Sequence, residues 1–295
     1  MRKTPTDIKE QLKAYAKELK ISDIGVCKAR VYDELCDALP KYDTPFVPSY
    51  DKRISPFAFV KNARSVIMCV FNYYTGEKND ANLSRYAWGL DYHSVVKNKL
   101  SKLCKLLKKD TGDFEHYIFC DNSPMCDKHL AYLSGLGFIG ENHLLIHPKY
   151  GSYVFIGGII TDLDIEEDVP LDTKCDGCKK CKESCPGRVF DELFDARKCA
   201  SYIMQKKGTL SADEQKIVAN SKKVWGCDIC SQVCPHNAHS VITDIEEFFV
   251  KSYNVEERFI KDDVSFKEAY KNRAFFWRGR ETIKRNTDII NTHNK

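Results

Sequence analysis

The stretch KCDGCKKCKESCP, residues 174–186, places four cysteines at spacings of two, two and three residues, with a proline after the fourth. A second run, GCDICSQVCP at residues 226–235, holds three more cysteines, and Cys199 lies alone between the two runs. Short spacings let successive turns of the backbone direct sulfurs at one centre, while a fourth cysteine before proline serves a second centre. The pattern predicts a small ferredoxin-like module with two [4Fe-4S] clusters.

The same spacing rule predicts that the two ligand sets are crossed between the runs. One cluster is expected to be held by Cys175, Cys178, Cys181 and Cys234, and the other by Cys185, Cys199, Cys227 and Cys230. Structural zinc and disulfides are the alternatives, because paired C-x2-C elements also bind zinc. Zinc sites normally use two separated pairs of cysteines, whereas here three cysteines at spacings of two residues are followed by a fourth and a proline. The six scattered cysteines are interpreted as small buried hydrophobic residues.

Length and composition are those of a globular protein with one large and one small domain. The chain has 295 residues, of which 43% are hydrophobic. Its first 20 residues are too polar for a secretory signal, and no apolar run approaches the roughly 20 residues of a membrane span. We therefore expect a cytoplasmic protein without a membrane partner, which agrees with thiolates that must stay reduced.

Hydrophobic periodicity predicts an α+β first domain over residues 1–168. Asp7, with Glu10 three residues later, is expected to open a helix. Strands are expected at residues 64–71, 116–120 and 153–161, and an amphipathic helix at residues 92–109. Residues 162–173, acidic and containing a proline, are typical of a linker. The cluster module would then occupy residues 169–245, followed by a helical tail at residues 246–295.

The tail is basic and contains interleaved aromatic residues. From Ser265 onward there are eight lysines and arginines against three acidic residues. Such a segment predicts either a nucleic-acid surface or a solvated amphipathic helix whose aromatic residues are core. The aromatic residues concerned are Tyr270, Phe275, Phe276 and Trp277.

A nicotinamide site is disfavoured in the first domain. The segment GLGFIG at residues 135–140 has the spacing of a dinucleotide-binding turn. It follows a predicted helix, whereas that turn follows a strand, and no suitable ribose-binding acid lies downstream. A different redox centre is therefore expected to receive electrons from the clusters.

Several motifs in one order resemble the epoxyqueuosine reductase family. They are DNSPMCDKHLAYLSGLGFIGENHLLI at residues 121–146, RYAWGLDYH at residues 85–93, the Gly-Ser pair at residues 151–152, and the two cysteine runs. The resemblance covers roughly residues 50 to 290. Asn122 stands where the family usually has serine or threonine.

The resemblance implies a nitroreductase-type cobalamin domain followed by a two-cluster ferredoxin-like domain. It implies that electrons pass through two [4Fe-4S] clusters to cobalamin, which reduces epoxyqueuosine to queuosine at the wobble position of tRNA. Asp121 matches the family's proton donor, and the pKa of its carboxyl would have to be raised for it to donate at neutral pH. The structural alternative for Asp121 is the N-cap of a helix over residues 128–133.

The resemblance also implies contacts at other positions. Residues that match cobalamin contacts are Arg53, Asp121, Leu145, His147, Ile156, Ser201 and Asp228, and Lys207 matches a tRNA-contacting lysine. His147 has an equal alternative as an ordinary loop histidine. The expected partners are tRNA with a modified wobble guanosine and an external electron donor such as ferredoxin or flavodoxin, and a monomer is expected.

The chain departs from the family pattern in ways that leave two alternatives. It stops near Lys295, about where many members begin a helical-repeat extension, so RNA would be held by the core and the tail. Glu141, Gln205 and His236 stand where lysine, glutamate and tryptophan are usual in the family. The alternatives are a cobalamin and iron-sulfur reductase of another small molecule, and a plain ferredoxin-type electron-transfer protein.

Overall fold

Strand β2 (Ser65–Asn72) is buried along its whole length in the computed structural model, which describes residues 4–38, 50–121, 125–191 and 194–293. It pairs antiparallel with β1 (Asp23–Lys28) and with β6 (Val154–Thr161), and β3 (His116–Cys120) completes the sheet order β1-β2-β6-β3. The three predicted strands are thus confirmed to within one residue. Asn122, which departs from the family motif, lies outside the described residues.

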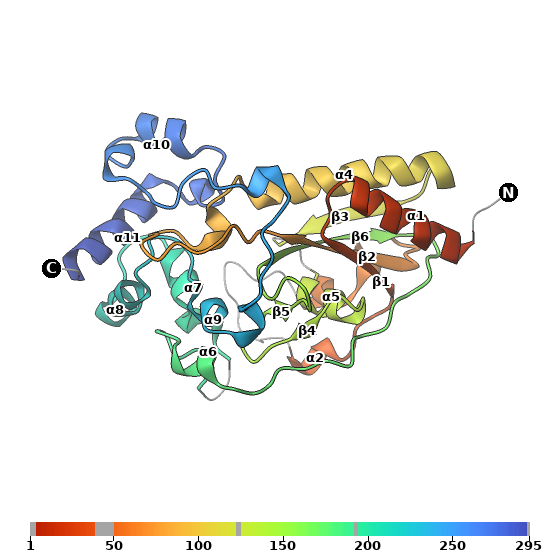
Figure 1. The fold of residues 1–295 in the computed structure, drawn as a ribbon, viewed down its shortest axis with the longest axis horizontal. Coiled ribbons are helices and arrows are strands. Elements are labelled where there is room, and N and C mark those ends of the chain that lie inside the picture. The colour runs from red at the N-terminus through yellow and green to blue at the C-terminus, as the bar shows by residue number, and fades with distance from the viewer. Residues whose placement is uncertain (1–3, 39–49, 122–124, 192–193, 294–295) are drawn as a thin grey trace.

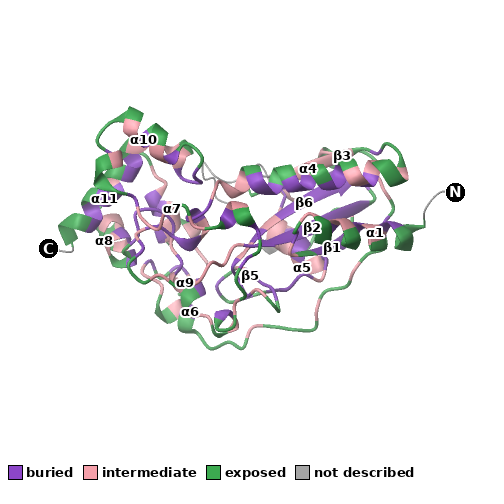
Figure 2. Cartoon of the chain, turned by 45° about the horizontal axis from the view of Figure 1, so that its top comes forward, coloured by how far each residue is buried: buried purple, intermediate pink, exposed green. Residues whose placement is uncertain are grey.

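The two faces of β2 enter two different cores because successive side chains of a strand point to opposite sides. Its odd-numbered residues, such as Ile67, pack with α1 (Pro5–Glu18) and α4 (Tyr92–Thr111). Its even-numbered residues, such as Met68, pack with α5 (Asp127–Leu133) and with the short hairpin. Figure 2 shows α4 with its buried face turned to the strands. The first lobe therefore has three layers, as expected for an α+β domain.

The second face of the sheet is covered by short elements. They are α2 (Leu35–Ala38), α3 (Tyr50–Ile54), α5 and the hairpin of β4 (Phe138–Ile139) and β5 (Leu145–Ile146). The GLGFIG segment follows α5 and forms the first strand of this hairpin, so the prediction that it follows a helix is confirmed.

Strand β1 was not predicted from the sequence. Its segment, DIGVCK, contains a glycine and is buried at four successive positions, so it shows no alternation. Gly25 is needed because a Cβ there would lie 2.0 Å from the backbone oxygen of Ser134, at the end of α5. This close approach of helix and strand cannot be read from periodicity.

The first helix begins earlier than predicted. The expectation that Asp7 and Glu10 open it is wrong: the helix begins at Pro5, and Thr4 is its N-cap. The Thr4 side chain accepts from Asp7 N at 3.2 Å, while Asp7 Oδ2 accepts from Thr4 N at 2.8 Å. A proline with no N–H and a preset φ is well suited to the first helical position.

The second lobe is built on short helices and its own core. These helices are α6 (Lys180–Glu183), α7 (Ala200–Met204), α8 (Ala212–Ser221), α9 (Ile229–Gln232), α10 (Asp263–Tyr270) and α11 (Arg280–His293). Figure 1 shows them grouped at the end of the molecule opposite the sheet. Residues 81–88, from the first half of the sequence, contribute Leu83, Ala87 and Trp88 to this core.

The predicted linker is tied to the first lobe. Asp168 N donates to Val26 O at 2.7 Å, and Asp168 Oδ2 accepts from Val26 N at 2.9 Å, so the segment is held against the edge strand β1. Lys9 Nζ adds an ion pair to Asp168 Oδ1 at 2.8 Å. From there the chain runs along the outside of the molecule to α6 (Figure 1).

The tail is helical, and its aromatic residues are largely core. Tyr270 and Phe275 are buried, whereas Trp277 is 53% exposed. Arg273 is also buried, where its Nη2 donates to the carbonyl oxygens of Ala87 and Trp88 at 2.6 and 2.9 Å. The interpretation of the tail as core-packed helices is therefore correct for most of it. No helix among the described residues is long and apolar enough to cross a membrane.

We predict that Gly226→Ala lowers thermal stability more than Gly208→Ala. Both glycines have positive φ, 71° and 75°, so both substitutions cost about 1 kcal/mol of backbone strain. A Cβ at Gly226 would also lie 2.5 Å from Ser84 Cβ, while nothing lies within 4 Å at Gly208. We expect an additional loss of about 1–3 kcal/mol from this overpacking. Thermal melting of the cluster-loaded variants measures it, and equal melting temperatures would contradict the close approach.

Candidate functional site

Asp121 directly follows β3, at the point where the chain turns away from the sheet. Its φ is 50°, a left-handed conformation that aspartate tolerates better than most residues. The turn leaves its side chain 55% exposed. The N-cap of α5 is Cys126, so the alternative that Asp121 caps this helix is wrong. The Asp121 carboxyl is therefore held at the end of a strand and is partly exposed to solvent.

Two neighbouring side chains of α4 contact the Asp121 carboxyl. The Tyr92 hydroxyl donates a hydrogen bond to Oδ2. His93 Nε2 lies 3.2 Å from the same oxygen. The Tyr92 ring is stacked between His93 and Phe155, with centroid distances of 4.0 and 4.2 Å. This packing fixes both donors.

Asp91 holds His93 from the other side. As the N-cap of α4, its Oδ1 accepts from His93 N at 3.1 Å and lies 2.8 Å from His93 Nδ1. The imidazole is therefore placed between two carboxylates, one on each ring nitrogen. Such an arrangement orients the ring and favours its protonated form.

The pKa values of His93 and Asp121 are shifted in opposite directions. Burial lowers the pKa of His93, but the carboxylates of Asp121 and Asp91 outweigh burial and raise that pKa to about 9. Asp121 is half exposed and surrounded by protein on its other sides. This partial burial opposes its ionisation, yet His93 and Tyr92 outweigh it and lower the pKa of its carboxyl. The family-based requirement of a raised pKa is not met by these residues alone, because a cation and a hydroxyl donor face the carboxylate.

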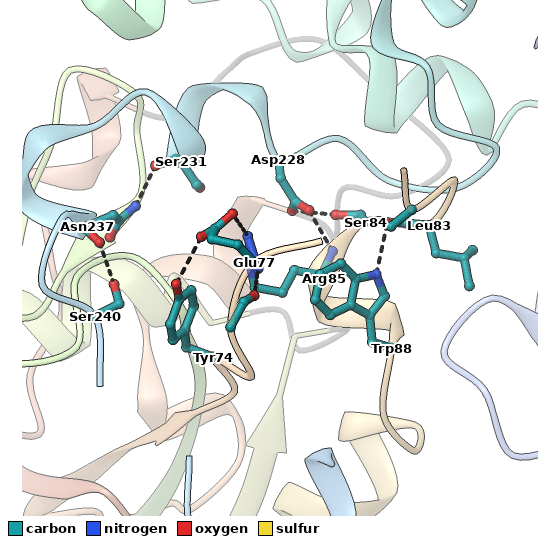
Figure 3. Close-up of polar contacts among 12 residues, drawn as sticks. Tyr74, Glu77, Leu83, Ser84, Arg85, Trp88, Asp228, Ser231, Asn237 and Ser240 are labelled. Atoms are coloured by element: carbon teal, nitrogen blue, oxygen red, sulfur yellow. Dashed lines mark hydrogen bonds and ion pairs between the residues drawn. The ribbon is translucent and has the colours of Figure 1, made fainter. Parts of the chain in front are cut away.

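Asp228 joins the two lobes, because it lies in the second-lobe loop that carries Cys227 and Cys230 and binds residues of the first lobe. Its buried carboxylate accepts from Ser84 Oγ and from Arg85 N, both at 2.5 Å. Figure 3 shows these bonds between the loop that follows Cys227 and residues 83–85. A parallel bridge between Leu83 and Trp225 extends the same seam. Asp228 is thus fully engaged in joining the two lobes.

Arg85 stabilises the first-lobe side of this seam. Its guanidinium carbon lies 4.9 Å from the ring centre of Tyr74 and 4.8 Å from those of Trp88 and Tyr153. Its Nη2 forms an ion pair with Glu77 at 3.0 Å, and the arginine side chain is 1% exposed. A desolvated cation held by aromatic faces and one carboxylate is a rigid support for the loop.

Asn237 makes a second joint between the lobes. Its Oδ1 accepts from Ser152 N at 2.7 Å, and its Nδ2 donates to Ser152 Oγ at 2.8 Å and to Ser231 O at 2.6 Å. This amide links the Gly-Ser motif of the first lobe to α9, which carries a cluster cysteine. Figure 3 shows its bond to Ser231 on α9.

The seven cysteines of the two runs and Cys199 gather in two groups. Four of them line one small hollow beside His236: Cys175, Cys178, Cys181 and Cys234. In the other group, burial and then the neighbouring Cys199 and Cys185 raise the pKa of the Cys227 thiol to about 12. Cys230 has three sulfur neighbours, Cys227, Cys199 and Cys185. These groups have the membership of the crossed ligand sets.

Tyr86 lies where the site residues of both lobes converge. Burial raises the pKa of its hydroxyl, the charges of Asp228 and Asp121 raise it further, and a hydrogen bond to Ser201 lowers it. Ser201, Asp228 and Asp121 therefore all lie near one partly buried side chain. Three of the predicted positions, from three separate segments, are brought together here.

The remaining predicted positions are more dispersed. Arg53, on α3, lies near Asp127 at the start of α5; burial raises the pKa of that carboxyl to about 6, and the charge of Arg53 opposes this rise. Leu145 on β5 is buried, and Ile156 on β6 is half-buried. Both ring nitrogens of His147 are used, since Nε2 lies 3.0 Å from Asp23 Oδ2 and Nδ1 accepts from Lys149 N at 3.0 Å. Both contacts of this ring are with residues of the first lobe, which agrees with the alternative that His147 is an ordinary loop histidine.

Lys207 is exposed at the rim of a hollow of about 920 Å3 between its loop and α11. Arg285 Nη1 donates to the carbonyl oxygens of Lys206 and Gly208, at 2.6 and 2.7 Å, so the tail holds this loop in place. Asp121 is not among the described residues that line this hollow.

The segment RYAWGLDYH resembles a family motif, but the sequence pattern alone indicates no role for any of its residues. The structure makes this the segment that supplies Arg85, Tyr86, Asp91, Tyr92 and His93. A signal was present, since three polar residues in succession open an otherwise amphipathic helix. The sequence does not show that β3 ends beside Tyr92 and His93, because this neighbourhood arises only in the folded chain.

Comparisons with known proteins agree with these features. Residues 53–122 match the family model of epoxyqueuosine reductase QueG (DUF1730), and residues 174–237 match that of a 4Fe-4S double cluster binding domain. An epoxyqueuosine reductase from Lactococcus garvieae is 30% identical over 95% of this chain and 85% of its own length. One from Bacillus cereus is 31% identical over 98% of this chain and 81% of its own.

This chain belongs to the epoxyqueuosine reductase family. Solved structures of the family superpose on most of it: one from Streptococcus thermophilus has a TM-score of 0.85 at 30% identity, covering 97% of this chain and 81% of the other. Another, solved with an epoxyqueuosine-modified tRNA stem loop, has a TM-score of 0.88 at 29% identity with the same coverage. The family membership and the double-cluster domain make this protein an oxidoreductase with two iron-sulfur clusters.

We predict that Cys234→Ala lowers the occupancy of both clusters. Cys234 comes from the second run but lies with the first group, so its loss frees a loop that also carries Cys227 and Cys230. Anaerobic reconstitution should give about eight irons in the wild type, and well under four in the variant. Cys36→Ala, at a scattered cysteine, is the control and should keep all of them. A variant that keeps the cluster of Cys175, Cys178 and Cys181 and loses only the other would contradict the crossed arrangement.

Proposed function

We propose that this protein reduces epoxyqueuosine to queuosine at the wobble position of tRNA. The observation that carries the proposal is the carboxyl of Asp121 at the end of β3, in contact with Tyr92 and His93. The loop of the second cysteine group is bound through Asp228 to Ser84 and Arg85, a few residues before Tyr92 and His93 in the chain. The related structure solved with a modified tRNA stem loop supports the substrate.

The reaction needs both lobes. Removing an epoxide oxygen as water and leaving a double bond consumes two electrons and two protons. Two [4Fe-4S] clusters can deliver electrons one at a time, and a carboxyl near the substrate can deliver protons to the leaving oxygen. We propose that electrons enter from an external donor such as ferredoxin or flavodoxin and that the protein acts as a cytoplasmic monomer.

We further propose that residues 1–168 form a nitroreductase-type cobalamin domain, with residues 169–245 as the cluster domain and residues 246–295 as the tail. The convergence of Ser201, Asp228 and Asp121 around Tyr86 fits a large ligand that contacts both lobes. Further contacts are proposed from Arg53 and Ile156 and from the backbone near Leu145 and His147. When bound, cobalamin supplies a strongly reducing, nucleophilic metal centre.

The hollow beside Lys207 supports a proposed contact with the tRNA backbone. Lys207, Arg278, Arg280, Lys284 and Arg285 line it, together with three acidic residues. Arg280 is paired with Asp263 at 2.7 Å, and Lys284 with Asp288 at 2.7 Å, so these two are partly neutralised. Lys207 is therefore the residue that we propose to contact a phosphate.

The two alternative functions are not favoured. A reductase of a different small molecule would not account for the matches to epoxyqueuosine reductases along 95–98% of the chain. A plain electron-transfer protein would have no use for a carboxyl presented with a hydroxyl donor and an imidazole at the end of β3.

The decisive experiment is mass analysis of epoxyqueuosine-containing tRNA after incubation with the reconstituted protein and a reductant. We expect conversion to queuosine by the wild type and none by Asp121→Asn, because an amide cannot act as the acid. The variant should keep its iron and cobalamin. Asp113→Asn, at a 95% exposed carboxylate between α4 and β3, is the matched control and should stay active. Product formation by Asp121→Asn in a single turnover would remove Asp121 from this role.

Binding of tRNA should weaken steeply with salt, because neutralising phosphates releases counterions. We expect Lys207→Ala to weaken binding and to reduce the slope of log K against log salt by about 1. Lys109→Ala, at the far end of α4, should change neither quantity (Figure 1). Filter binding over a series of salt concentrations measures both, and an unchanged slope in Lys207→Ala would exclude a phosphate contact at this residue.

A further inference from the structure

The proton balance of the proposed reaction demands a second proton-carrying group. Two protons have to reach one oxygen for it to leave as water, but a carboxyl holds only one. Asp121 must therefore be protonated again during the reaction. Tyr92 is unsuited to this task, because burial and the charge of Asp121 raise the pKa of its hydroxyl well above the ordinary value. A tyrosine that holds its proton so firmly remains a hydrogen-bond donor.

His93 is the other group in contact with Asp121. Its Nε2 is buried and lies 3.2 Å from Asp121 Oδ2, yet it makes no hydrogen bond in the part of the chain described. The distance is that of an ion pair, while the N–H is not aligned with the oxygen. A small rotation of the carboxyl, which is half exposed, would align it. Nδ1, in contrast, is held by Asp91 at 2.8 Å.

The charges around His93 come from three elements. On α4 itself they are Asp91 and Lys97, with the neutral Tyr92 between them; β3 contributes Asp121; and α5 contributes Asp127 and Lys128. The two carboxylates in direct contact with the ring outweigh the more distant lysines. The site therefore keeps a proton on the imidazole and keeps the adjacent carboxylate ionised.

We propose that His93 recharges Asp121 with protons, so that Asp91, His93 and Asp121 form a relay to the substrate oxygen. In each transfer the His93 Nε2–H bond breaks as the Asp121 O–H bond forms, and that O–H bond breaks as the substrate O–H bond forms. The neutral imidazole then takes a proton from solvent. Asp91 keeps its contact with Nδ1 and holds the ring in place. His93 is thus a positioning residue that acts through Asp121, and this inference rests on the proposed function.

The test compares His93→Gln with the wild type in the reconstituted enzyme with modified tRNA. General acid catalysis contributes about 10²–10⁴-fold, so we expect kcat to fall about 100-fold with KM for tRNA changed less than about 2-fold. Wild-type kcat should fall as the pH rises through about 9, where the imidazolium of His93 loses its proton. His93→Gln should lack this inflection, and Asp91→Asn should move it to lower pH. His129→Gln removes a histidine that pairs with Glu34 at 3.0 Å elsewhere in the lobe, and should leave rate and profile unchanged.

A second readout needs no turnover. NMR titration of the histidine resonances in the full chain, with both clusters oxidised, should show one imidazole that titrates near 9 and is absent in His93→Gln. Asp121→Asn should bring that titration to lower pH. Titration of His93 at an ordinary histidine pKa would overturn the relay, as would a His93→Gln enzyme with the wild-type rate and pH profile. An inactive wild type would instead overturn the proposed function, and the relay with it.

Discussion

The buried carboxylate of Asp228 is the contact on which the arrangement of the two lobes depends. It accepts from Ser84 Oγ and Arg85 N, and thereby places the loop of Cys227 against the first lobe. Removing it would leave two buried donors unpaired, at about 1–3 kcal/mol each. Gly226, directly before the loop, allows the backbone to come this close because it has no side chain. Asn237 repeats the joint on the other side of α9.

This seam gives the two lobes complementary tasks. In the first lobe, Asp121 directly follows β3, and Asp91 is the N-cap of α4. The end of this strand and the first turn of this helix therefore bring an acid, an imidazole and a hydroxyl together. The second lobe carries the eight cysteines, in two groups. Residues 81–93 belong to both, since they pack in the second core and also carry His93. A displacement of this segment would therefore change the proton site and the cluster loop together.

Much of the fold follows from patterns in the chain. Three strands of the main sheet and the long helix α4 were predicted closely, because buried strands and amphipathic helices have clear periodicities. The cysteine grouping was predicted as well, from spacing alone. Strand β1 was missed because its glycine serves a distant contact with Ser134, and the start of α1 was misplaced because Pro5 lies inside the helix. Both errors concern contacts or conformations that a periodic pattern does not record.

By itself, the sequence predicted the crossing of the cluster ligands, and it determined the number of clusters, the presentation of Asp121 at a strand end, and the family to which the chain belongs. These depend on local spacing and on motifs that stay in one order. The tertiary structure alone decided the protonation of the site. Asp121 was expected to need a raised pKa, but His93 and Tyr92, 28 and 29 positions away in the chain, lower it. Electrostatic effects depend on distances in space, and those distances exist only once β3 and α4 pack side by side.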